Sequence, residues 1–114
     1  MNYKFKNKED WFYVFSEQSR YSIIERFTYY DWTPQKIQSI ITGIEESKTK
    51  EKGEEFFWGS EDVSLYSNKN GVLLIDEMAI RGGEDNPEKV SLQLTHEEML
   101  TFLNDFKKFV EENS

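Results

Sequence analysis

The sequence contains no cysteine and one histidine, and it has only two prolines and six glycines among its 114 residues. Without cysteine the chain has no disulfide and no thiolate ligand for zinc, which excludes a disulfide-stabilised secreted scaffold and favours a reducing compartment. We find no internal repeat and no Pro/Gly/Ser-rich linker that would divide the chain. These absences predict a single domain over residues 1–114.

Long hydrophobic runs are also missing. No segment approaches the roughly 20 apolar residues that a membrane span needs. The first residues, Met1-Asn2-Tyr3-Lys4-Phe5-Lys6, alternate polar and apolar side chains and lack the apolar core of a secretory signal. We therefore expect a cytoplasmic protein with no membrane partner.

Catalytic patterns are sparse. The single histidine, His96, directly follows a predicted helix N-cap, and helix N-termini disfavour a cationic imidazole, so we interpret it as a capping-turn residue rather than a general base. Gly82-Gly83 is interpreted as a turn, since no phosphate-binding motif surrounds it. We predict no catalytic residues, no cofactor and no metal site. Adjacent carboxylates leave one enzymatic alternative open, which is an enzyme that uses paired carboxylates with a divalent metal.

The first third of the chain is rich in residues that favour strands. Residues 11–15 and 21–28 are aromatic or β-branched, and the polar segment 17–20 between them predicts a hairpin turn. Tyr3 and Phe5 alternate with lysines and suit a short edge strand ahead of this hairpin.

Two helices are marked by their caps and by apolar stripes of 3.6-residue period. The first starts with Thr33 as N-cap and Pro34 at the first helical position. Gly43 interrupts its stripe and indicates either a close approach to the sheet or an early end. The last starts with a capping box of Thr95 and Glu98. The stripe residues are Ile37, Ile40, Ile41 and Ile44, then Met99, Phe102, Leu103, Phe106, Phe109 and Val110.

Further strands are expected between these helices. Asn68-Lys69-Asn70-Gly71 is a strong turn signal because Asn and Gly tolerate positive φ. The expected segments are strands at 54–59, 62–67 and 72–80, a loop at 81–88, and a strand at 90–94. The fold class is therefore α+β: an antiparallel sheet of five to six strands with two helices packed on one face, in the order strands, helix, strands, helix.

The net charge of −8 is distributed unevenly. Residues 1–53 hold nine basic and eight acidic side chains, whereas residues 54–114 hold five basic and fourteen acidic ones. Such an acidic half repels a phosphate backbone and attracts a basic protein, although acidity also serves solubility alone. The one basic stripe is Lys4, Lys6 and Lys8. We expect a basic protein partner and no nucleic acid.

Aromatic residues make up 16% of the chain, which is more than a core of this size readily hides. If Phe56 and Trp58 point inward on their strand, Phe57 points outward, among carboxylates. Exposed rings bordered by charge are typical of protein-binding hot spots. The predicted partner-binding residues are Glu54, Glu55, Phe57, Trp58, Glu61, Asp62, Tyr66, Asp76 and Glu77.

Three segments of the chain resemble bacterial immunity proteins of the contact-dependent growth inhibition and polymorphic toxin type. They are the run Glu54-Glu55-Phe56-Phe57-Trp58, the turn Asn68–Gly71, and Leu92-x-Leu94-Thr95 leading into Glu97…Phe109-Val110. This resemblance implies a protein that is not an enzyme and that binds and neutralises a cognate toxin domain, for which a nuclease is expected. The opening Met1–Phe5 and the element order are also similar to the uncharacterised YacL family, which implies instead a small regulatory or adaptor protein with an endogenous partner. A monomer or a weak dimer is compatible with both resemblances.

Overall fold

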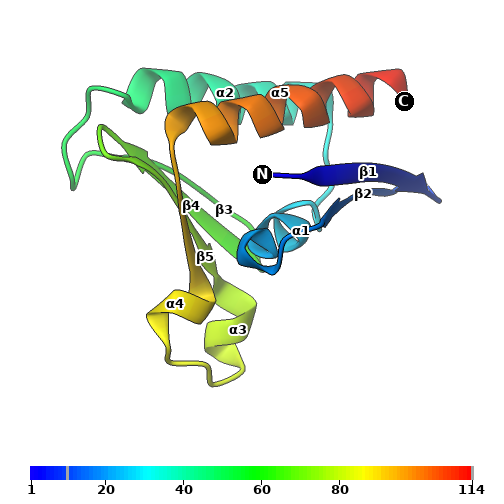
Figure 1. The fold of residues 1–114 in the computed structure, drawn as a ribbon. Helices are drawn as coiled ribbons and strands as arrows, with labels where there is room; N and C mark the ends of the chain where they lie inside the picture. Colours follow the sequence, from blue (N-terminus) through cyan, green and yellow to red (C-terminus); the bar gives the residue numbers. More distant parts are fainter. Residues whose placement is uncertain (10, 114) are drawn as a thin grey trace.

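The computed structural model describes residues 1–9 and 11–113, and within them the α+β prediction is confirmed. Six antiparallel strands form two sheets (Figure 1). The two-stranded sheet is β1 (Tyr3–Lys8) and β2 (Trp11–Ser16); the four-stranded sheet, in spatial order, is β3 (Phe56–Gly59), β4 (Val63–Asn68), β5 (Gly71–Asp76) and β6 (Ser91–Leu94). The helical segments are η1 (Ser19–Tyr21), α1 (Ile23–Phe27), α2 (Pro34–Ser47), α3 (Glu77–Arg81), α4 (Pro87–Val90) and α5 (His96–Glu112).

The two long helices, α2 and α5, lie side by side and pack on the sheets (Figure 1). Their predicted caps are confirmed: the Thr33 hydroxyl accepts a hydrogen bond from the Lys36 amide at 3.2 Å, and Thr95 and Glu98 form a capping box. The predicted stripes are buried, apart from Phe109, which is half-buried. Caps and stripes together place the two main helices where the sequence predicted them.

Most of the buried core residues are aliphatic, and a connected cluster of aromatic rings lies among them. Trp32 and Trp58 stack with their centroids 5.2 Å apart, and Phe27 lies 5.0 Å from Trp32 and 5.1 Å from Trp58. The Trp32 indole N–H donates to the Phe27 carbonyl at 3.3 Å, so this buried donor has a partner. Phe106 of α5 meets Trp32 edge to face at 5.8 Å, which joins the ring cluster to the helix layer.

The predicted strand at residues 21–28 is wrong, because this segment forms η1 and α1. β2 pairs instead with β1, in a register that runs from Tyr3↔Ser16 to Lys8↔Trp11. Ile23, Ile24 and Phe27 are buried, a spacing that suits one face of a helix. The Glu25 carboxylate accepts a hydrogen bond from the Ser16 amide at 2.9 Å and thereby holds α1 against the end of β2.

The predicted strand at 72–80 is too long. β5 ends at Asp76 because its carboxylate accepts a hydrogen bond from the Ala79 amide at 2.9 Å and so caps α3. The segment expected to be a loop, 81–88, contains the end of α3 and the start of α4, which Asn86 caps. These short helices form a lobe beyond the end of the sheet (Figure 1).

The β1–β2 hairpin is attached to the core through one face, to which Phe5 of β1 and the buried Val14 of β2 belong. The ring of Phe5 stacks on Phe106 and Phe109 at centroid distances of 5.7 and 5.2 Å. The Tyr3 hydroxyl donates to the Asp105 carboxylate on α5. Burial, and then the hydrogen bond and the negative charge of Asp105, raise the pKa of Tyr3 far above its ordinary value. The hairpin therefore presents one face to α5 and leaves the other outside.

Gly43 lies where α2 approaches β3 closely, so the first of its two interpretations, a close approach to the sheet rather than an early helix end, is confirmed. A Cβ placed there would lie 2.3 Å from the Phe56 ring. We expect Gly43→Ala to lower the free energy of unfolding by about 1–2 kcal/mol, because the steric cost of overpacking exceeds the gain in helix propensity. Urea denaturation measures this, with the exposed Thr42→Ala of the same helix as the matched control. Equal or greater stability of Gly43→Ala would show that the helix and β3 do not approach this closely.

Tyr3 predicts a pH dependence. Since its pKa is raised in the folded state, the hydroxyl proton stabilises the fold below the unfolded pKa of about 10, and this contribution is lost as the pH rises above that value. Tyr3→Phe has no proton to lose. We therefore expect its free energy of unfolding to fall less steeply above pH 10 than that of the unaltered chain, measured by urea denaturation at a series of pH values. Parallel curves would contradict the Tyr3–Asp105 contact.

Candidate functional site

The four-stranded sheet has one face toward the core and one that α1, α2 and α5 leave uncovered. The cross-strand register places Phe57 opposite Tyr66 and Tyr66 opposite Leu73, with Gln93 beyond, and Ile75 follows Leu73 on the same side of β5. We call these five residues the outer sheet face. They are at least partly solvent-accessible, unlike the fully buried Leu65 and Leu74 on the inner face.

Phe57 is the most exposed ring of the chain, with 55% of its surface accessible. Its ring contacts Tyr66 at a centroid distance of 5.1 Å. Gly59 makes room for it, because a Cβ at that position would lie 2.9 Å from the Phe57 ring. The pair Phe57–Tyr66 is thus a preformed aromatic platform that spans the edge strand β3 and its neighbour β4.

A shallow hollow of about 340 Å³ lies beside this platform. Its floor is lined by Tyr66, Leu73 and Ile75. One border is formed by Lys52 and Glu55, which lie in the segment between α2 and β3. Concave apolar surface beside an exposed ring is the shape that accepts a side chain of a binding partner.

Acidic side chains lie at both ends of the outer sheet face. Glu54 and Glu55 precede β3, although Lys52 stands beside Glu55 and offsets part of this charge. Glu61 and Asp62 lie in the β3–β4 turn at the far end. The Asp62 carbonyl accepts from the Glu77 amide at 2.9 Å, which brings the start of α3 against that turn.

Two predicted site residues do not share this face. Trp58 points inward, where it stacks on Trp32. The side chain of Asp76 is only 8% exposed, and it pairs with Arg26 at 2.9 Å. Seven predicted residues therefore border or occupy the outer side of the sheet or its ends, while Trp58 and Asp76 support the fold.

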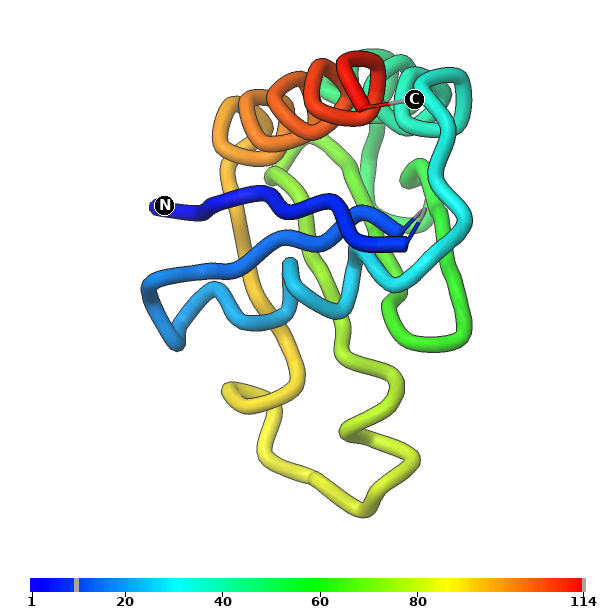
Figure 2. The backbone as a smooth tube through the Cα atoms, turned by 90° about the vertical axis from the view of Figure 1, so that its right-hand side faces the viewer, coloured from blue at the N-terminus to red at the C-terminus, as the bar shows by residue number. Residues whose placement is uncertain are grey.

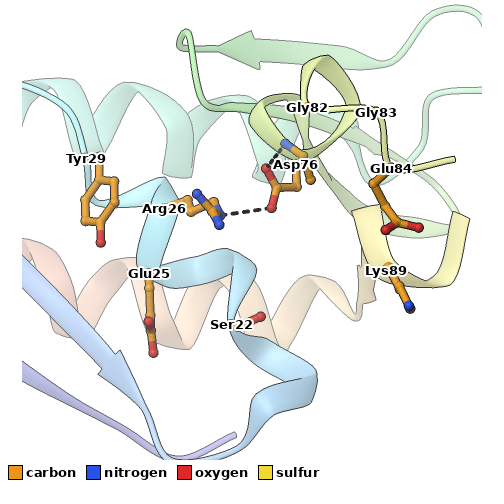
Figure 3. Close-up of a pocket in the computed structure, with 10 residues that line it drawn as sticks. Ser22, Glu25, Arg26, Tyr29, Asp76, Gly82, Gly83, Glu84 and Lys89 are labelled. Atoms are coloured by element: carbon orange, nitrogen blue, oxygen red, sulfur yellow. Dashed lines mark hydrogen bonds and ion pairs between the residues drawn. The ribbon is translucent and has the colours of Figure 1, made fainter. Parts of the chain in front are cut away.

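The Arg26–Asp76 pair lies in a second, open cleft of about 680 Å³ between α1 and the α3–α4 lobe (Figure 3). Tyr29, Glu84 and Lys89 also line this cleft. Asp76 uses one oxygen for Arg26 and the other for the Ala79 amide, so its charge is satisfied within the fold (Figure 3). We interpret this pair as the link between α1 and the lobe.

His96 makes a tertiary contact that the sequence did not predict. Its Nε2 lies 2.6 Å from the Asn68 carbonyl oxygen, so the imidazole joins the β4–β5 turn to the start of α5. Among residues 1–9 and 11–113, no three His, Asp or Glu side chains gather in a way that could hold a metal ion. No helix in these ranges is long and apolar enough to cross a membrane.

Comparison with protein-family models, with curated proteins and with solved structures finds no match to this chain. Sequence reasoning missed Leu73 and Ile75 as members of the outer sheet face. The signal was present, since residues 72–75 are apolar at every position, which places hydrophobic side chains on both faces of one strand.

Proposed function

We propose that the chain is an immunity-type protein, which binds and neutralises a basic toxin domain through the outer sheet face. The observation that carries this proposal is the exposed Phe57–Tyr66 pair on a sheet face that the long helices leave free. An exposed ring that a neighbouring glycine accommodates is a costly feature for a folded chain, and binding to another protein accounts for it.

The apolar part of this face supplies contact energy. A ring such as Phe57, half exposed in the free chain, loses its remaining hydration when a partner covers it, and the hollow beside Tyr66 receives a side chain in return. The sheet holds these groups in place before binding. Little conformational entropy is then lost at the interface, which favours tight binding.

The acidic ends supply orientation and speed. A toxin that cleaves nucleic acid has a cationic site, because its substrate is anionic. Glu54 and Glu55 at one end, and Glu61, Asp62 and Glu77 at the other, attract such a surface and repel acidic proteins. Occupation of the cationic site by this face would exclude the substrate.

The edge position of β3 favours one alternative, an adaptor of the YacL type that acts on an endogenous partner as a weak dimer. β3 has no strand on its other side among the described residues, so two copies paired through β3 would bring their Phe57 rings together. Sedimentation of the isolated chain separates the two: a dimer that Phe57→Ala dissociates favours the adaptor, and a monomer favours the immunity protein.

The test uses the polypeptide encoded directly upstream of this chain as the probe. We expect co-expression to give a one-to-one complex, and Phe57→Ala to raise its Kd at least tenfold, because a central ring is a hot spot. Ile80→Ala, which removes a large exposed apolar side chain from the α3–α4 lobe, is the matched control.

Urea denaturation of the isolated variants completes this experiment. Since Phe57 is mostly exposed, its loss should lower the free energy of unfolding by less than about 1 kcal/mol, so weaker binding would not reflect unfolding. Absence of a complex, or a complex that Phe57→Ala leaves unchanged, would contradict the proposal.

A further inference from the structure

The β1–β2 hairpin has an outer face of its own. On β1, Tyr3 and Phe5 pack toward α5, so the intervening lysines point to the other side. On β2, Val14 is buried and Phe12 contacts Phe109. The rings at the alternating positions of β2 therefore point to the same outer side as the lysines of β1. The outward residues are Lys4, Lys6 and Lys8 of β1 and Trp11, Tyr13 and Phe15 of β2.

The register pairs each of these lysines with one ring. The cross-strand partners are Lys4↔Phe15, Lys6↔Tyr13 and Lys8↔Trp11. Directly opposite residues have Cβ atoms about 4.5–5.5 Å apart, and successive pairs on one face repeat at roughly 6.8 Å, which is two strand residues. We call this row of three ammonium groups beside three rings the lysine–aromatic ladder.

The ladder is open to solvent. Trp11 and Phe15 are 48% and 51% exposed, and all three lysines are exposed. Tyr13 is half-buried, and Tyr29, itself 49% exposed, extends the row with its centroid 6.4 Å from Tyr13. The hairpin lies at the front of Figure 2, with the four-stranded sheet behind it.

The lysine charges are largely unused within the fold. Lys4 lies 3.5 Å from the Glu17 carboxylate, but both side chains are more than half exposed, so this pair is weak. No carboxylate of the described residues lies within ion-pair distance of Lys6 or Lys8. Lys8 thus stands opposite the exposed Trp11 and Lys6 opposite the half-buried Tyr13, and neither lysine has an ion-pair partner in the described part of the chain.

We propose that the lysine–aromatic ladder binds single-stranded nucleic acid, with bases stacked on Trp11, Tyr13 and Phe15 and phosphates beside the lysines. Single-stranded nucleic acid needs both a line of cations and a line of rings, and the hairpin provides both at a common repeat. An acidic polypeptide would use the lysines and leave the three rings without a matching group. This site shares no residue with the outer sheet face, so it does not depend on the proposed toxin binding.

The net charge of −8 led us to expect no nucleic acid, but the β1–β2 pairing gathers lysines and rings on one face of the hairpin. Four carboxylates of residues 54–114 belong to the α3–α4 lobe, which stands apart from the hairpin (Figure 1), and five belong to α5, which packs on the hairpin face opposite to the ladder. The overall charge still opposes a polyanion, so we expect moderate affinity that falls steeply with salt.

Fluorescence anisotropy with a labelled 12-nucleotide oligothymidylate tests the charged half of the ladder. We expect saturable binding in low salt. The triple variant Lys4→Gln, Lys6→Gln, Lys8→Gln should lower the slope of log Kd against log salt by about 2, as expected for three phosphate contacts to a single strand. The matched control is Lys50→Gln, Lys52→Gln, Lys108→Gln, which removes three exposed lysines outside the ladder and changes the net charge equally.

The same assay tests the rings. Trp11→Ala and Phe15→Ala should each weaken binding at least about fivefold, because base stacking is lost, while Trp11→Tyr should retain most of the affinity. A 12-base-pair duplex should bind at least about tenfold more weakly, since its bases are already stacked. Equal loss in the lysine control, no loss with the ring variants, equal binding of duplex, or binding of poly-glutamate in place of the oligonucleotide would each overturn the proposal.

Discussion

The contact between the aromatic cluster of the core and a single face of the four-stranded sheet determines the rest of this structure. Trp58 reaches inward from β3 and stacks on Trp32, and Phe27 from α1 closes the cluster. Because strand side chains alternate, each ring committed to this core leaves its neighbour on the opposite side. Phe57 is outside for the same reason that Trp58 is inside.

The hairpin repeats this division. Phe5 and Val14 face the core, and the intervening lysines and rings are left outside. Two open faces result, one bordered by carboxylates and one by ammonium groups. The aromatic residues are shared between the core, where they join many buried aliphatic residues, and the two outer faces.

Local signals predicted the two long helices and most of the strands. The caps at Thr33 and Thr95 and the periodic stripes after them fix α2 and α5, and Asn68–Gly71 fixes the β4–β5 turn, where Gly71 has φ of 123°. The sequence predicted a hairpin of residues 11–15 and 21–28, whereas β2 pairs with β1. The turn between β1 and β2 was missed because the sequence there has no Gly or Asn to mark it. Glu9 has φ of 52°, a conformation that favours Gly or Asn, and no such residue marked it.

The candidate site was predictable only in part, because alternation gives the side of a strand but not what covers it. Alternation correctly placed the Phe57 side chain on the solvent-exposed side of its strand. It gave no sign that Asp76 would cap α3 and pair with Arg26, since both contacts come from elements that the sequence did not predict. The ladder was hidden for a related reason: the lysines were visible as a stripe, but the rings opposite them depend on the pairing of β1 with β2.

Hydroxyl-radical footprinting of the free chain, read by mass spectrometry, tests most directly whether the two ring-bearing faces are open. Our account predicts rapid oxidation of Phe57, Trp11 and Phe15 and strong protection of Phe27 and Trp32, which are buried. Protection of Phe57 equal to that of Phe27 would show that the outer sheet face is covered, and would contradict the account.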